Sequence, residues 1–177
     1  MTIIFLARHG ESDWNVEKRF QGHSDRPLTE RGREQAHALA DLVASEKIEA
    51  IYTSPLSRAR ETAEIVAARA ALEPLALPEL REVDTGSWSG LSRVDVEARF
   101  PDGFARWRSG GSGWEDGETY EEMGERVIRA TRRGRALLCG GASSPGIGWE
   151  FGQRIERLAA RRAARAGGCE VGKTSRI

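Results

Sequence analysis

The chain has 177 residues, of which 39% are hydrophobic and 31% are charged, a composition typical of one globular domain with a sizeable core. Its 27 basic residues balance its 27 acidic residues, and a formal net charge of zero argues against a general nucleic-acid or membrane surface. No apolar run approaches the roughly 20 residues that a membrane span requires, and no signal peptide is predicted. We therefore expect a cytoplasmic protein that binds neither nucleic acid nor membrane.

The zero net charge hides an uneven distribution along the chain. Residues 1–130 contain 17 basic and 24 acidic residues, whereas residues 131–177 contain 10 and 3, so the two segments carry net charges of −7 and +7. The second segment is also rich in Arg, Gly and Ala. We expect one domain over residues 1–177 in which 131–177 is atypical, through a frameshift or through divergence, and in which residues 167–177 are disordered.

The first predicted element is a strand. Five apolar residues, Ile3–Ala7, predict a strand that is buried on both faces, and Arg8, His9 and Gly10 follow it directly. Ligands bind at the carboxyl ends of strands in α/β sheets, so the cation and the imidazole are candidate site residues. An ordinary exposed loop is the alternative.

The chain then alternates helices with strands. Apolar residues recur at helical spacing over Glu30–Ser45, for which Thr29 is the predicted N-cap. Further strands are predicted over Ile48–Tyr52, 75–77 and 136–139. This alternation predicts an α/β fold, a three-layer α/β/α sandwich with a mainly parallel sheet.

The helix after the second strand carries another candidate cation. Ser54 as N-cap and Pro55 at the first helical position predict its start, which places Arg58 in its first turn. A cation there opposes the helix dipole, so the placement is explained if Arg58 and the free backbone N–H groups share an anion. A solvated arginine is the alternative. The two strand ends would bring Arg8, His9 and Arg58 to one edge of the sheet.

These residue types suit phosphoryl transfer. Two guanidinium groups can donate bidentately to a tetrahedral phosphate, and a neutral imidazole between them can attack phosphorus to form a phosphohistidine. The leaving oxygen then needs a proton, and Glu82, beside a glycine-rich loop, is the best candidate for the general acid. Because the two cysteines form no CxxC pair and the chain has only three histidines, no metal site is predicted.

Several short motifs follow one another along residues 1 to about 130. They are Arg8-His9-Gly10-Glu11 with Trp14-Asn15, Phe20-Gln21-Gly22, Pro27-Leu28-Thr29, Gly32, Ser54-Pro55-Leu56-Ser57-Arg58-Ala59 with Thr62, and Leu80-Arg81-Glu82 with Gly86. As an ordered set, these motifs resemble the signature of the histidine phosphatase superfamily, whose fold is phosphoglycerate mutase-like.

The resemblance implies a role for each matched position. The implied catalytic residues are His9 as phosphate acceptor, Arg8 and Arg58 as phosphate clamps, and Glu82 as proton donor. The implied substrate-binding residues are Asn15, Gln21 and Gly22. No cofactor and no metal are implied, the expected partner is a small phosphorylated metabolite, and a homodimer is left open.

One part of the family pattern is missing. The family needs a second His, in an SHG or THG motif that ends a later strand, and this chain has no His after His37. Residues 136–139 are expected to take the place of that strand, with Cys139 or Gly140 near the position of the absent imidazole. Neither can replace it, because a thiol is a weak donor and glycine has no side chain.

The expected activity is therefore hydrolysis of small phosphomonoesters through a phosphohistidine, impaired by the missing His. Two alternatives remain open. Phosphoglycerate mutase-type transfer is disfavoured because the connection between Gly90 and Thr119 is short. It lacks the long insertion that would make the chain resemble the cofactor-dependent phosphoglycerate mutases. A non-catalytic phosphate-binding remnant is favoured by the incomplete catalytic set.

Overall fold

A computed structural model of the chain describes residues 3–46, 48–130, 136–140 and 171–175. Most of the atypical segment lies outside these ranges, so its interpretation as a frameshift or as divergence stays a prediction. Within the described part of the chain, no helix is both long enough and apolar enough to cross a membrane.

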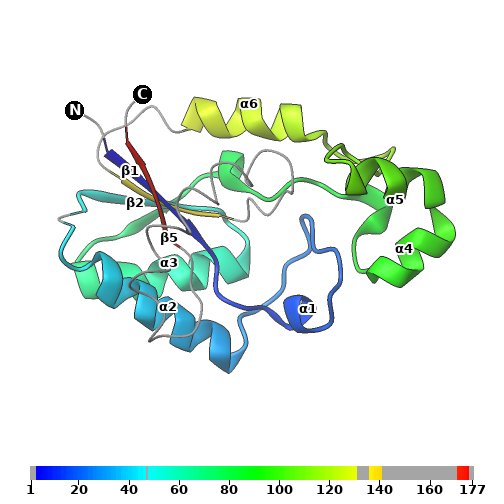
Figure 1. Cartoon of the computed structure of the whole chain (residues 1–177). Coiled ribbons are helices and arrows are strands. Elements are labelled where there is room, and N and C mark those ends of the chain that lie inside the picture. The colour runs from blue at the N-terminus through cyan, green and yellow to red at the C-terminus, as the bar shows by residue number, and fades with distance from the viewer. Residues whose placement is uncertain (1–2, 47, 131–135, 141–170, 176–177) are drawn as a thin grey trace.

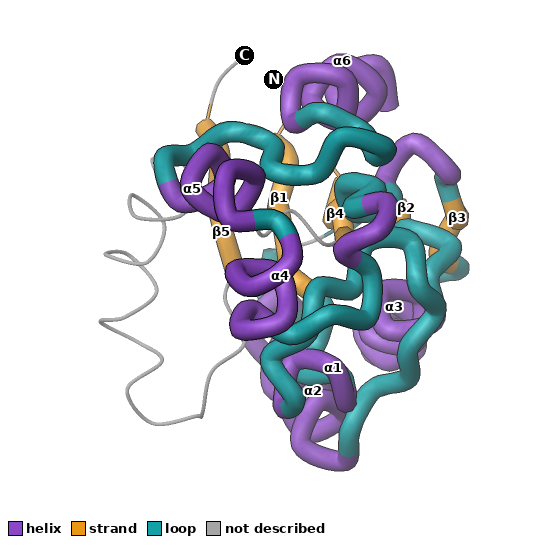
Figure 2. The backbone as a smooth tube through the Cα atoms, turned by 90° about the vertical axis from the view of Figure 1, so that its right-hand side faces the viewer, coloured by secondary structure: helices purple, strands orange, loops and turns teal. Residues whose placement is uncertain are grey.

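The described strands form one sheet of mainly parallel strands. They are β1 (Ile3–Arg8), β2 (Ala50–Thr53), β3 (Pro74–Ala76), β4 (Ala136–Gly140) and β5 (Val171–Ser175). Their order is β3-β2-β4-β1-β5, which Figure 2 shows across the sheet. β5 runs antiparallel to β1, whereas the other neighbouring strands are parallel.

Helices cover both faces of this sheet. Helices α2 (Glu30–Val43) and α3 (Ser57–Ala70) lie side by side on one face, and α6 (Tyr120–Ala130) lies on the other (Figure 1). The predicted three-layer α/β/α sandwich is therefore confirmed. The shorter helices lie beyond the carboxyl end of β1, in the region where a ligand site is expected. They are α1 (Asp13–Val16), α4 (Arg93–Arg99) and α5 (Pro101–Arg108).

Two apolar clusters fix this arrangement. The first packs the sheet against α2 and α3, with residues of β1 and β2 meeting apolar residues of both helices. Its buried members are Phe5, Ala7, Leu39, Ala40, Val43, Ile51, Ala63, Val66 and Ala67. The second joins α4, α5 and α6 through aromatic side chains; its buried members are Val83, Trp88, Val96, Phe104, Trp114, Tyr120 and Met123. Loops that lead to the site are therefore anchored on two sides by buried apolar surface.

The start of α2 agrees with the sequence, but the start of α3 does not. Thr29 caps α2 by accepting a hydrogen bond from the Gly32 N–H at 3.0 Å, as predicted. The predicted Ser54–Pro55 start of α3 is wrong by two residues, because the helix begins at Ser57. Its first N–H donates to the Asp25 carboxylate at 2.6 Å, and this hydrogen bond lowers the pKa of Asp25.

The strand predicted over 136–139 is confirmed as β4, which lies between β1 and β2 at the centre of the sheet. The expected disorder of residues 167–177 is wrong for residues 171–175. These residues pair with β1 through backbone hydrogen bonds, which a polar segment can form without an apolar pattern. The rest of the range 167–177 lies outside the described residues.

Candidate active site

A cavity of about 630 Å³ opens at the carboxyl end of β1. The structure brings all seven sequence-predicted site residues into its wall: Arg8, His9, Asn15, Gln21, Gly22, Arg58 and Glu82. They come from β1 and the turn after it, from α1 and the loop after it, from the first turn of α3, and from the segment after β3. Their roles remain predictions, but the topology places them around one space.

His9 is buried, and its hydrogen bonds fix one tautomer. Nδ1 lies 2.7 Å from the Gly10 carbonyl oxygen, which can only accept, so Nδ1 carries the proton. The lone pair is then on Nε2, which accepts a hydrogen bond from Nε of Arg58 at 3.2 Å. Burial, followed by the positive charges of Arg58 and Arg8, lowers the pKa of His9 to about 3. The imidazole is thus neutral at neutral pH, which is the form a nucleophile needs.

The turn that carries His9 requires close backbone contact with α2. A Cβ atom on Gly10 would lie 2.2 Å from the carbonyl oxygen of Gly32, a distance that no side chain can occupy without moving the backbone. The Gly10 N–H donates to Thr62 Oγ1 at 3.1 Å, and that hydroxyl donates to the Arg58 carbonyl oxygen at 2.7 Å. Thr62 therefore links the turn that carries His9 to the start of α3.

Arg58 is only 1% exposed although it carries a charge. Its Nη1 donates to the Ser24 carbonyl oxygen at 2.8 Å and its Nη2 to that of Gly22 at 2.9 Å, so the guanidinium plane is fixed. One N–H on each Nη nitrogen has no partner among the described residues. Burial lowers the pKa of Arg58 and the Glu82 carboxylate opposes this, but a guanidinium stays charged in proteins. The arrangement leaves a fixed, charged donor pair at the cavity wall.

Glu82 places a carboxyl group in the same wall, and only 7% of the residue is exposed. One carboxyl oxygen accepts the Val83 N–H at 2.9 Å. Its backbone carbonyl oxygen accepts Nε2–H of His23 at 2.8 Å, which ties this segment to the loop after α1. A carboxyl held in this way can exchange a proton with a ligand oxygen in the cavity.

The amide side chains of Asn15 and Gln21 are oriented by Ser12. The Asn15 amide oxygen accepts the Ser12 N–H at 2.9 Å, and the Gln21 amide oxygen accepts the Ser12 hydroxyl at 2.8 Å. Because the oxygens are engaged, the NH₂ groups are the parts left to donate to a ligand. A binding role for both residues stays a prediction.

Sequence reasoning missed Thr85. Its hydroxyl is buried in the cavity wall, and within the described part of the chain it has no hydrogen-bond partner. Such a group is costly to bury unless a ligand or water satisfies it. The sequence gives no signal for it, since Thr85 lies in a stretch whose glycines and serines predict only a loop.

A family model described as the histidine phosphatase superfamily (branch 1) matches residues 4–141. The chain belongs to this superfamily. It is 40% identical over 107 residues to phosphoserine phosphatase 1 of Hydrogenobacter thermophilus, covering 60% of this chain and 51% of that one. It is 38% identical over 146 residues to a probable phosphoglycerate mutase GpmB of Photorhabdus laumondii, covering 79% and 66%. The matches thus span about half to two thirds of these relatives.

Solved structures of this superfamily share the fold. Bacillus stearothermophilus YhfR superimposes with a TM-score of 0.73 at 31% identity, covering 90% of this chain and 79% of that one. A mycobacterial glucosyl-3-phosphoglycerate phosphatase complexed with VO3 superimposes with a TM-score of 0.70 at 29% identity, covering 80% and 76%. The predicted phosphoglycerate mutase-like fold is confirmed.

β4 is the strand on which the resemblance led us to expect a second His. The parallel pairing of β1 with β4 joins Ala7 to Cys139 and Arg8 to Gly140, one residue before His9. β4 therefore ends beside the site, as expected. No His follows His37 in the sequence, so the strand is present but its imidazole is not.

Proposed function

We propose that this protein hydrolyses phosphomonoesters of small metabolites through a phosphohistidine on His9, and that the missing second His slows turnover. The observation that carries the proposal is the His9 ring, which is neutral, buried and fixed with the Nε2 lone pair beside Arg58. Membership of a superfamily with phosphatase and mutase relatives supports the reaction class.

The proposed reaction has two steps. The Nε2 lone pair of His9 attacks phosphorus, the bond from phosphorus to the ester oxygen breaks, and the Glu82 carboxyl gives its proton to that oxygen. Water then attacks the phosphohistidine, the Glu82 carboxylate takes its proton, and the N–P bond breaks to release phosphate. Arg8 and Arg58 neutralise the phosphoryl oxygens in both steps, and a bound phosphoryl oxygen competes with Nε2 for the Arg58 Nε–H.

The missing imidazole determines the expected rate. In this superfamily the second His donates to the transferring phosphoryl group, and β4 offers no side chain able to do so. Loss of one preorganised transition-state donor costs about 2.7–4 kcal/mol, or roughly 10²–10³-fold in rate. Phosphate binding should persist because the two guanidinium groups remain.

The cavity rim favours an ester whose leaving group carries a further negative charge. A single antiparallel β-bridge joins the backbones of Arg19 and Ser92. It brings the adjacent residues Lys18 and Arg93 to the same stretch of the cavity wall. The Arg93 guanidinium lies over the Trp107 ring, 5.5 Å from its centroid. Two cations on one stretch of the wall can both donate to a carboxylate or a second phosphate of the substrate. Phosphorylated hydroxy acids are therefore the preferred substrate class over phosphomonoesters whose leaving group is uncharged.

A nitrophenyl phosphate assay combined with phosphate-binding calorimetry tests the proposal. We expect slow turnover that His9→Ala abolishes, together with phosphate binding that Arg58→Ala weakens. Binding without any turnover or phosphoenzyme would support the second candidate, a phosphate-binding remnant, which the missing His favours. Neither binding nor turnover would reject both. An acidic group on the substrate should improve kcat/KM, and Lys18→Gln should reduce that gain.

A further inference from the structure

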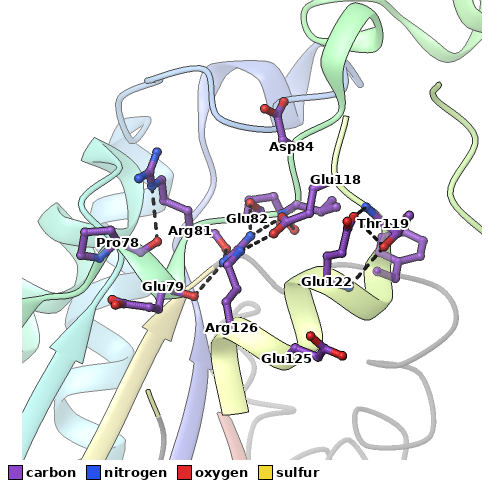
Figure 3. Close-up of polar contacts among 12 residues, drawn as sticks. Pro78, Glu79, Arg81, Glu82, Asp84, Glu118, Thr119, Glu122, Glu125 and Arg126 are labelled. Atoms are coloured by element: carbon purple, nitrogen blue, oxygen red, sulfur yellow. Dashed lines mark hydrogen bonds and ion pairs between the residues drawn. The ribbon is translucent and has the colours of Figure 1, made fainter. Parts of the chain in front are cut away.

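Arg126, on α6, uses all five of its N–H donors within the protein (Figure 3). Its side chain is 14% exposed, and its Nε and Nη2 each donate to one oxygen of Glu118 at 2.5 Å. Nη1 donates to the carbonyl oxygens of Glu79 and Arg81, both at 2.7 Å. The second Nη2 proton goes to the Glu82 carbonyl oxygen at 2.9 Å. No donor is left for a ligand, so this arginine serves an internal purpose.

The three carbonyl groups belong to one short segment, residues 79–82, which ends at the proposed general acid. A guanidinium group is planar and rigid, so three acceptors bound to it cannot rotate independently. The backbone that carries the Glu82 side chain is thereby held against α6. The carboxyl contact with the Val83 N–H depends on the same backbone.

We propose that Arg126, oriented by Glu118, is the positioning residue for the general acid Glu82. The inference rests on the proposed function, in which Glu82 gives a proton to the leaving oxygen. A catalytic group displaced by about 1 Å loses roughly 10²-fold in rate, because proton transfer needs hydrogen-bond distance. The bidentate ion pair with Glu118 fixes the guanidinium plane, and that plane fixes the segment.

Loss of Arg126 should loosen this segment without unfolding it. His23 also donates to the Glu82 carbonyl oxygen, at 2.8 Å, so that acceptor keeps a partner. The Glu79 carbonyl contact is exposed and the Arg81 carbonyl contact is half-buried, so water can take the place of Arg126 at these two oxygens. The expected defect is therefore a misplaced acid in a folded protein.

Leaving-group dependence separates positioning from a general structural role. Arg126→Met should slow single-turnover phosphoryl transfer from an alkyl phosphate by roughly 10- to 100-fold, and transfer from nitrophenyl phosphate much less, because nitrophenolate leaves without a proton. Affinity for inorganic phosphate should not change. Arg126→Lys should restore only part of the alkyl rate, since an ammonium lacks the planar fork.

Arg129→Met is the matched control. Arg129 lies one turn further along α6, is exposed, and within the described part of the chain pairs only with Glu125, at 4.0 Å. Arg129→Met should leave the transfer rates from both substrates and the affinity for phosphate unchanged. Equal slowing of both substrates in Arg126→Met, or full rescue by Lys, would overturn the positioning role.

Glu82→Gln identifies which claim fails. If Glu82→Gln slows phosphoryl transfer from alkyl and aryl phosphates equally, the role of Glu82 in the proposed function is wrong. If Glu82→Gln slows the alkyl reaction more than the aryl reaction but Arg126→Met does not, only the positioning role of Arg126 is wrong. Adding Arg126→Met to Glu82→Gln should slow the alkyl reaction little further, since both changes remove the same function.

Amide hydrogen exchange at Val83 gives a readout that needs no turnover. Its N–H donates to the Glu82 carboxyl, so exchange should be faster in Arg126→Met than in wild type and unchanged in Arg129→Met. Identical exchange at Val83 in wild type and both variants would contradict the inference.

Discussion

Replacing His9 by Asn should change how stability depends on pH. Unfolded histidine has a pKa of 6.5, whereas the pKa of folded His9 is about 3. Between these values the unfolded state binds a proton that the folded state excludes, so protonation favours unfolding. The contribution of His9 to stability is therefore complete above pH 6.5 and is lost as the pH falls toward 3.

The magnitude follows from linkage. One proton bound only by the unfolded state lowers the free energy of unfolding by about 1.4 kcal/mol per pH unit. Over the two units from about pH 6.5 to 4.5, His9 should account for about 2–3 kcal/mol. Asn cannot be protonated there, so the stability of His9→Asn relative to wild type should rise by this amount as the pH falls.

Urea unfolding at several pH values, in a buffer free of phosphate, measures this difference. Carboxylates titrate in both proteins, so their effects cancel in the comparison. His37→Asn is the control, because His37 is exposed on α2. A stability difference between His9→Asn and wild type that stays constant from pH 6.5 to 4.5 would refute the burial argument for a neutral nucleophile.

Three further changes test other parts of the site. Arg58→Ala should weaken phosphate binding by about 10–150-fold in calorimetry, with Arg58→Lys recovering part of it; equal affinity in all three proteins would show that Arg58 does not hold phosphate. Gly10→Ala should destabilise the fold by about 1–3 kcal/mol in urea, because its methyl group meets the Gly32 carbonyl oxygen, and an unchanged midpoint would contradict that contact. Replacing the chain after Gly134 with a strand that ends in the superfamily's SHG motif should raise kcat by at least about tenfold; no gain would mean that the second His supplies less than expected.

The sequence predicted those parts of the fold that depend on local periodicity. The apolar stripe and the Thr29 cap of α2 lie within a few residues of one another, so the pattern located the helix correctly. The start of α3 was missed because the side chain that accepts its first N–H is Asp25, 32 positions earlier in the chain. β5 was missed because backbone pairing with β1, rather than apolar side chains, defines it.

The candidate site was predictable where short motifs carry the chemistry. His9 follows a buried strand, and Arg58 follows the next one, so parallel topology alone brings them together. Thr85 and Arg126 could not be found in this way. A buried hydroxyl and a guanidinium that binds three carbonyl groups are recognisable only when their surroundings are known.

Trapping the phosphoenzyme intermediate tests most directly whether His9 accepts the phosphoryl group. The protein is mixed with a ³²P-labelled aryl phosphate, quenched with denaturant, and divided between acid and alkali. Phosphoramidates are acid-labile and alkali-stable, so label should survive alkali, be lost in acid, and be absent from His9→Ala. Label that remains on the His9→Ala protein with the same stability would contradict the account.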